Sequence, residues 1–119
     1  MRRQAARALV ALALLAPASG VVAAEPACRL HGSRVFQRKA DLPPGVVQAL
    51  GFAIAERGAP FQATDVIGPG PRLPGSRFVA ARQTACRLAL RYEQGGIAHT
   101  WNTAILERRG DLWILLRRR

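Results

Sequence analysis

An alternation of apolar and polar side chains on both sides of a glycine pair constrains the fold most strongly. Residues 86–93 alternate as a half-buried strand does, with Leu88, Leu90 and Tyr92 on one side. Gly95 and Gly96 can supply the positive backbone angles of a two-residue hairpin turn. This turn pairs Tyr92 with His99, Leu90 with Trp101, Leu88 with Thr103 and Cys86 with Ile105. One face is then apolar and the other polar, and that agreement is the basis for the predicted register.

A second hairpin is predicted after the first, with Arg109 and Gly110 as its turn. The pairing places Leu106, Trp113 and Leu115 together on the face opposite the predicted core. Such an apolar patch is either covered by another part of the chain or is a contact surface for another molecule. An exposed Trp113 would favour a dimer or partner interface.

The segments before residue 77 predict a strand, a helix and a long loop. Residues 28–37 are expected to form the strand, with a kink at Gly32. Residues 41–58 have apolar residues at helical spacing and a glycine at the end, although Gly51 leaves two short helices as an alternative. Residues 59–77 contain four prolines and three glycines. We expect little there beyond a strand at 61–67, with Phe61, Val66 and Ile67 packed down, and this loop is the best candidate for a binding loop.

These elements predict the α+β class: a small single domain with one helical segment packed on an antiparallel β-meander of three to five strands. The layout resembles that of cystatin-like and related small secreted folds. The resemblance concerns the arrangement of elements alone, and it implies no function.

The first 24 residues have the features of a bacterial secretory signal. Three arginines precede an apolar run at residues 8–16, and small residues before Glu25 suit cleavage after Ala24, with a cut after Gly20 as the alternative. The run is shorter than the about 20 residues that a membrane-spanning helix needs. Residues 25–119 are therefore expected to be one exported domain, periplasmic or secreted, without a transmembrane segment. Lipidation is not expected at Cys28, because Glu25 stands where an aliphatic residue is required.

Two cysteines, Cys28 and Cys86, lie in the predicted exported part. An even number in an oxidising compartment predicts one disulfide. It would close a loop of about 59 residues and contribute roughly 4 kcal/mol to stability in the chain-entropy model. No metal site is expected, because these cysteines and the two histidines, His31 and His99, lack the close spacing of zinc ligands. No cofactor is expected either.

The predicted exported part is basic. Three of the 18 basic residues lie in the signal, and the other 15 outnumber the seven acidic residues by eight. A cationic exported protein favours an anionic partner, such as lipopolysaccharide, an acidic glycan or an acidic envelope protein. Nucleic acid is not expected as a partner outside the cytoplasm. The alternative is a solvated surface that only keeps the protein soluble.

Tyr92, His99 and Trp101 form the candidate site that the predicted register creates. They are either a ligand cleft or cross-strand aromatic packing at the rim of the core. Asp65 is the acid that we expect to reach His99. No nucleophile or metalloprotease motif is present, so an enzyme is not expected.

Three function classes follow from the sequence. The first is a non-catalytic binding or inhibitor-type protein that uses the patch at Leu106, Trp113 and Leu115, or the loop at 59–76, against a protein. The second is a cationic module for anionic envelope polymers. The third is an enzyme around His99.

Overall fold

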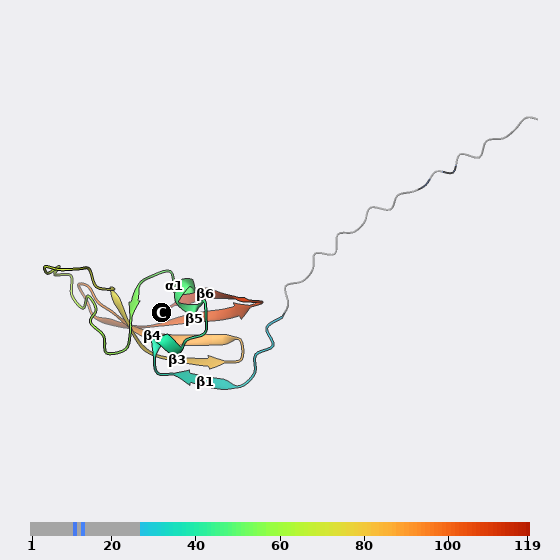
Figure 1. Ribbon diagram of the computed structural model, residues 1–119, viewed down its shortest axis with the longest axis horizontal. Helices are drawn as coiled ribbons and strands as arrows, with labels where there is room; N and C mark the ends of the chain where they lie inside the picture. The colour runs from blue at the N-terminus through green and yellow to red at the C-terminus, as the bar shows by residue number, and fades with distance from the viewer. Residues whose placement is uncertain (1–10, 12, 14–26) are drawn as a thin grey trace, which may run out of the picture.

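The structure is a computed structural model that describes residues 11, 13 and 27–119 (Figure 1). The predicted signal segment and its cleavage site after Ala24 therefore fall outside the described residues, apart from two isolated positions. The described chain forms a six-stranded sheet with one short α-helix and a 3-10 turn. In chain order the elements are β1 (Ser33–Phe36), η1 (Lys39–Asp41), α1 (Val46–Leu50), β2 (Ile54–Ala55), β3 (Ser76–Thr84), β4 (Arg87–Gln94), β5 (Thr100–Arg109) and β6 (Leu112–Arg118).

The sheet is a meander extended by two short strands. Its order is β1-β3-β4-β5-β6, and consecutive strands from β3 to β6 pair antiparallel. At the outer edge of β3, β1 pairs antiparallel with the end of the strand and β2 pairs parallel with its start. The predicted α+β class, with a helix packed on an antiparallel meander, is confirmed, although the helical content is small.

The helix is shorter than predicted. Gly51 adopts a left-handed conformation (φ 74°) and ends α1 after Leu50. Residues 54–55 instead pair with β3 as a strand. The predicted helix over 41–58 is therefore wrong before Val46 and beyond Leu50, and no second short helix follows Gly51 within residues 51–58. Val46, Leu50 and Ile54 are still buried, because the bent chain turns all three toward the core.

Glu56, just after β2, is hydrogen-bonded to the start of the segment that connects β1 to β2. Its carboxylate accepts hydrogen bonds from the backbone N–H groups of Lys39 (2.7 Å), Ala40 (3.0 Å) and Arg57 (2.8 Å). The Lys39 ammonium in turn donates to the carbonyl oxygen of Ile54 (2.8 Å). Burial raises the pKa of the Glu56 carboxyl, but the backbone donors together outweigh it and hold the pKa below its ordinary value.

The register of β4 and β5 differs from the prediction. Gln94 pairs with Thr100 and Leu88 with Leu106, so residues 95–99 form the loop and the partners are displaced by three positions. An odd displacement exchanges the two faces of a strand. The predicted pairs of Tyr92 with His99 and of Leu90 with Trp101 are therefore wrong.

The two glycines serve a close approach between backbones rather than a two-residue turn. A Cβ atom on Gly95 would lie 1.9 Å from the carbonyl oxygen of Gln62 and 2.7 Å from the Cα of Ala63. The Gly95 N–H donates to the carbonyl of Gly75 (3.0 Å), and the Gly96 N–H to that of Ala63 (3.4 Å). Glycine is needed at position 95 because a distant segment occupies the space of a side chain.

The pairing of β5 with β6 is displaced by two positions near the turn. Arg109 pairs with Leu112 and Leu106 with Leu115, which leaves Gly110 and Asp111 as the turn. An even displacement keeps each residue on its face. Leu106, Trp113 and Leu115 therefore share a face, as predicted.

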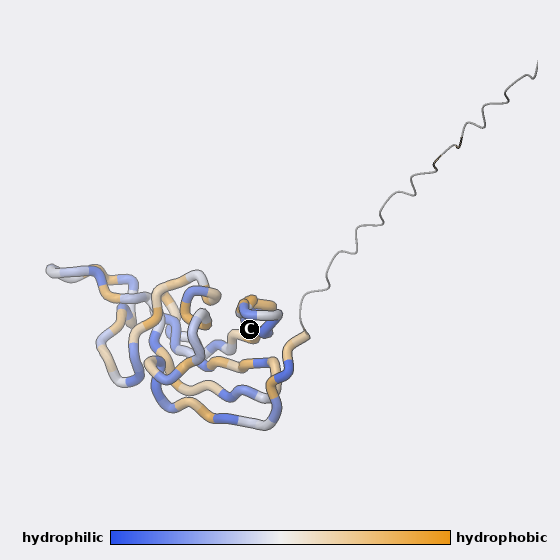
Figure 2. The backbone as a smooth tube through the Cα atoms, turned by 45° about the vertical axis from the view of Figure 1, so that its right-hand side comes forward, coloured by the Kyte–Doolittle hydropathy of each residue, from blue (hydrophilic) through white to orange (hydrophobic). Residues whose placement is uncertain are grey.

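The core lies between this face of the sheet and the segment that contains η1 and α1. Hydrophobic and hydrophilic residues alternate along the strands, as Figure 2 shows. The buried cluster consists of Phe36, Leu42, Val46, Leu50, Ile54, Phe78, Ala81, Leu88, Leu90, Tyr92, Ala104, Leu106 and Trp113. One face of the sheet is thus covered. We call the other face, which points away from α1, the open face.

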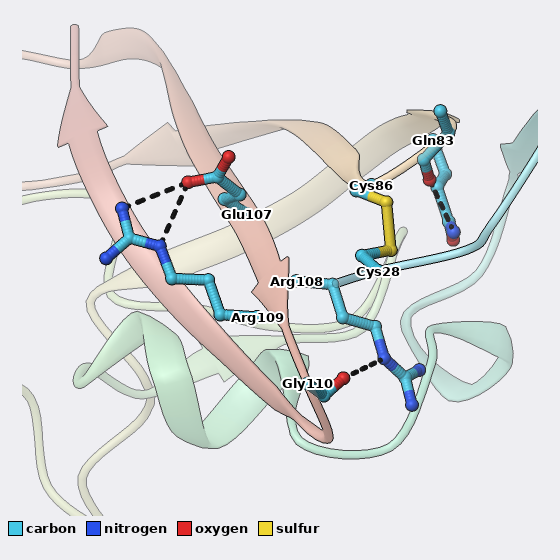
Figure 3. The surroundings of a disulfide bond; sticks show 8 residues. Cys28, Gln83, Cys86, Glu107, Arg108, Arg109 and Gly110 are labelled. Carbon is cyan, nitrogen blue, oxygen red and sulfur yellow. Dashed lines mark hydrogen bonds and ion pairs between the residues drawn. A yellow bond between two sulfur atoms is a disulfide. The ribbon is translucent and has the colours of Figure 1, made fainter. Parts of the chain in front are cut away.

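The predicted disulfide is confirmed. Cys28 and Cys86 are bonded, with their Cα atoms 6.1 Å apart (Figure 3). The bond attaches the segment before β1 to the turn between β3 and β4. The carbonyl of Cys86 also accepts a hydrogen bond from the N–H of Arg108, 2.8 Å away. The disulfide fits a protein in an oxidising compartment, where such bonds persist.

Candidate binding surfaces

A cluster of polar and aromatic side chains lies on the open face beside the β4–β5 loop. Arg77 of β3 pairs with Glu93 of β4, and Glu93 pairs with Trp101 of β5, so the three side chains form one row across the sheet. The Nε of Arg77 donates to the Oε2 of Glu93 at 2.5 Å. Glu93 is only 6% exposed, and the ion pair compensates for the burial of its charge.

Two further rings complete this cluster. The imidazole of His99 stacks on the indole of Trp101, with centroids 5.4 Å apart, and its Nε2 lies 3.6 Å from the Oε1 of Glu93. Phe61, from the long loop, meets the edge of His99 at 5.9 Å and lies under the guanidinium of Arg77 at 4.3 Å. We call Phe61, Arg77, Glu93, His99 and Trp101 the hairpin cluster.

The ion pair between Arg77 and Glu93 dominates the electrostatics of the hairpin cluster. The hydrogen bond to Glu93 raises the pKa of the Arg77 guanidinium. Among the described residues, no hydroxyl or thiol side chain makes a hydrogen bond with His99. The cluster thus combines one ion pair with three aromatic rings beside the β4–β5 loop.

A hollow of about 260 Å³ adjoins the cluster. Its lining consists of Arg57, Gly58, Arg77, Phe78, Val79, Glu93 and Trp101. Arg57 also donates from Nη1 to the Oε1 of Gln37 (2.6 Å), which holds its guanidinium in place. Since Arg77 and Glu93 neutralise each other, Arg57 gives the hollow a net positive charge.

Of the residues predicted to form one site, only His99 and Trp101 lie next to each other. His99 and Trp101 belong to the hairpin cluster, whereas Tyr92 is buried in the core on the other face, with its ring 5.1 Å from that of Phe52. Asp65 is exposed in the long loop. The expectation that Asp65 reaches His99 is wrong, because Glu93 is the acid beside the imidazole.

The predicted apolar patch is part of the core. Leu106 is fully buried, Trp113 is 6% exposed, and Leu115 packs against the same cluster. The segment with α1 covers them, and a Cβ on Gly45 would meet the Trp113 ring at 3.7 Å. Of the two alternatives for this patch, coverage by the chain itself is therefore correct, and the interface is not.

Exposed apolar side chains gather instead at the tips of two loops. Ile97, in the β4–β5 loop, is 94% exposed, and Val66, Ile67 and Leu73 are exposed in the long loop. The expectation that Val66 and Ile67 pack down is wrong, as is the strand predicted at 61–67. This region has only an isolated bridge between Thr64 and Gly96. We call Val66, Ile67, Leu73 and Ile97 the loop-tip surface.

The long loop extends past the sheet at the end away from the disulfide (left in Figure 1) and is braced internally. The N–H of Gln62 donates to the carbonyl of Pro74 (2.8 Å) and closes the base of the loop. The side-chain amide of Gln62 donates to the carbonyls of Thr64 (2.8 Å) and Val66 (2.7 Å). These bonds, with the contacts at Gly95, hold both loop tips at one end of the molecule.

The middle of the open face carries small apolar residues and arginines. The cross-strand rows there are Val35–Arg82–Ala89–Ile105–Arg117 and Ala80–Arg91–Thr103, followed toward the disulfide by Thr84–Arg87–Glu107–Ile114. A shallow hollow of about 310 Å³ lies between Arg82 and Arg91, over Ala80 and Ala89. The small side chains leave this space, and no helix of the described residues covers it.

Most of these arginines lack an acidic partner. Glu107 is bound by Arg109, whose Nη2 lies 3.1 Å from Oε2, and Glu93 is bound by Arg77. Within the described part of the chain no carboxylate lies at ion-pair distance from four further arginines of this face, Arg82, Arg87, Arg91 and Arg117, all of them exposed. The open face therefore has an excess of positive charge.

Sequence reasoning missed Arg77, Glu93 and Phe61 as site residues. The row of Arg77, Glu93 and Trp101 follows from the pattern only when the β4–β5 register is correct, and the glycine pair led to another register. The sequence predicts that Phe61 packs down, but only the docking of the long loop brings its ring to His99 and Arg77.

Among residues 27–119, no three histidine, cysteine, aspartate or glutamate side chains come together in a way that could hold a metal ion. The helical segments of the described chain are too short to cross a bilayer. Comparison with protein-family models, curated protein sequences and solved structures found no match for this chain.

Proposed function

We propose that this is an exported, non-catalytic binding protein that contacts a partner protein through the loop-tip surface. The observation that carries the proposal is the gathering of exposed Val66, Ile67, Leu73 and Ile97 at one end of the fold. Exposed apolar side chains that gather at one end of a small protein are candidates for an interaction site. The partner that fits is a folded protein with an apolar cleft that both loop tips enter.

The rigidity of the loops supports this proposal. Binding is weakened by the entropy lost when flexible segments become ordered. Four prolines and the hydrogen bonds of Gln62 restrict the long loop before any partner is present. A preorganised apolar tip can therefore bind with a smaller entropic loss.

The tips carry charges of both signs, which fits a protein better than a uniformly anionic lipid surface. Arg72 stands next to Leu73, and the Asp65 carboxylate stands next to Val66, where anionic head groups would repel it. An apolar cleft in a protein can place a donor or a cation beside this carboxylate. The disulfide supports export, because such bonds persist in oxidising compartments.

Site-specific photocrosslinking tests the proposal. A photoreactive residue at position 97 is compared with one at Leu112, which is also strongly exposed (67%) but starts β6 at the disulfide end. Both full-length variants are expressed in the cells that produce the protein. We expect discrete protein adducts from position 97, lost when Ile67→Ser is added, and none from position 112.

Three results would contradict the proposal. They are the absence of adducts at position 97, equal adducts at both positions, and adducts to lipid alone, which would assign the loop tips to a membrane surface.

A further inference from the structure

The unpaired arginines of the open face form a series that follows the strands. Arg87 and Arg91 lie four residues apart on β4, which places their Cα atoms about 13 Å apart along the strand. Arg82 and Arg117 lie in the cross-strand row through Ala89, which is between the rows of Arg87 and Arg91. A ligand that engages these groups together needs several negative charges along an extended backbone. A single small anion does not match this arrangement.

The surface between the arginines suits a flat hydrophilic ligand rather than a bulky apolar one. The hollow between Arg82 and Arg91 is floored by Ala80 and Ala89, and Thr103 adds a hydroxyl beside it. Two guanidinium groups beside a shallow floor would be desolvated by an inserted hydrocarbon, at a high cost in free energy. A ring whose edges carry oxygen atoms can lie on the floor and still hydrogen-bond to both arginines.

Trp101 continues this surface at the end of the same face. Its indole is 59% exposed although His99 stacks on it, so part of the ring is open to solvent. It also lines the hollow that contains Arg57 and Glu93. A pyranose has an apolar face that packs on an aromatic ring, and its hydroxyl groups can reach the charged groups around the indole.

We propose that the open face binds an acidic glycan. One sugar packs on Trp101 with its carboxylate toward Arg57, and further carboxylates lie near Arg91 and Arg82. Arg77 stays with Glu93 and positions this carboxylate to accept from sugar hydroxyl groups. The site goes beyond the proposed protein contact, because it uses a different face and none of the loop-tip residues.

Isothermal titration of the full chain with three probes tests this site. The probes are tetragalacturonate, with rings and charge; maltotetraose, with rings alone; and linear polyphosphate, with charge alone. We expect tetragalacturonate to bind most tightly and its affinity to fall with added salt. Binding should also change the tryptophan fluorescence, since Trp101 is exposed whereas Trp113 is buried.

Three variants assign the residues. Arg82→Gln combined with Arg91→Gln is expected to weaken tetragalacturonate binding about tenfold, from two lost charged contacts. Trp101→Ala should weaken it about fivefold, abolish the fluorescence change and leave polyphosphate binding unaltered. The control Arg38→Gln removes an exposed charge that precedes η1 and belongs to none of the cross-strand rows of the open face, and should stay within about twofold.

Several outcomes would overturn the site. They are equal binding of maltotetraose or polyphosphate by the unmodified protein, an equal loss in the Arg38→Gln control, or full affinity in the double arginine variant. Thermal melts show whether each variant is folded, and the conservative Trp101→Phe, which keeps a ring, should restore part of the affinity lost in Trp101→Ala. Ile97→Ser should bind the glycan normally, so failure of this site is distinguishable from failure of the loop-tip surface.

Discussion

The two ends of the β-sheet are held together in different ways. At one end the disulfide Cys28–Cys86 and two tight turns, at residues 85–86 and 110–111, fix the strands through short and local connections. At the other end the loop 95–99 is wider, and the segment 59–75 docks on it through backbone hydrogen bonds and the close approach at Gly95. Covalent and local constraints thus dominate one end, and contacts between distant segments dominate the other.

This difference separates the stability of the fold from its recognition surfaces. The tight turns at the disulfide end set the pairing of β3 with β4 and of β5 with β6, whereas the pairing of β4 with β5, which brings Trp101 beside Glu93, is connected at the loop end. The loop end carries the loop-tip surface and the hairpin cluster. Changes at the first end should alter global stability, and changes at the second should alter the shape of the candidate sites.

Removal of the disulfide is expected to have the largest effect. The double variant Cys28→Ser and Cys86→Ser frees a loop of about 59 residues in the unfolded chain and should lower the free energy of unfolding by roughly 4 kcal/mol. Urea denaturation of the variant and of the oxidised protein measures this difference. If both unfold at the same urea concentration, the disulfide end does not dominate stability.

Truncation of β5 side chains tests the register of β5 against β4. Leu106 is fully buried, so Leu106→Ala should cost about 3 kcal/mol through lost contacts and a cavity. Ile105 is only half-buried on the open face, and Ile105→Ala should cost about 1 kcal/mol. Thermal or urea melts of both variants compare them. A larger loss for Ile105→Ala than for Leu106→Ala would instead support the register predicted from the glycine pair, in which Ile105 faces the core.

A methyl group at Gly95 tests the docking of the long loop. Gly95→Ala places a Cβ against the backbone of residues 62–63 and should cost about 2 kcal/mol through overpacking. It should also expose Phe61 and displace the rings of His99 and Trp101. Gly68→Ala is the matched control, since a Cβ there meets nothing within 4 Å. The two variants are compared by urea unfolding and by Trp101 fluorescence. If Gly95→Ala and Gly68→Ala have the same free energy of unfolding and the same fluorescence, the long loop is not in close contact with Gly95.

The smallest expected effect is the pH response of Glu56. Its folded-state pKa is lowered, so the carboxylate stabilises the fold at pH values above its ordinary pKa of 4.5, and this contribution is lost as the pH falls through the lower folded value. Glu56→Gln lacks this contribution. The stability difference between the two proteins should therefore shrink between pH 7 and about pH 3. A difference that is constant with pH would mean that the backbone donors do not favour the charged form.

Much of the fold could be predicted because it rests on local patterns. Strands β4 to β6 follow from the alternation of side chains, and the pairing of Cys28 with Cys86 follows from there being two cysteines. The helix was overestimated because Val46, Leu50 and Ile54 fit a helical stripe, while Gly51 ended the helix and Ile54 was buried from a strand. The binding surfaces were predicted least well. Only His99 and Trp101 were placed in the site, and their neighbours were wrong.

The amino-acid sequence by itself determined the meander, the cross-link and the excess of basic residues, since each depends on residue type and local spacing. Tertiary structure decided which face of each strand points inward, because a shift of one residue in pairing exchanges both faces and the local pattern accommodates more than one register. It also decided the structural role of Gly95 and Gly96, which is a close approach to another backbone segment rather than a two-residue turn. The space that excludes a side chain at position 95 is filled by a segment some thirty residues earlier in the chain, and only the folded protein brings the two together.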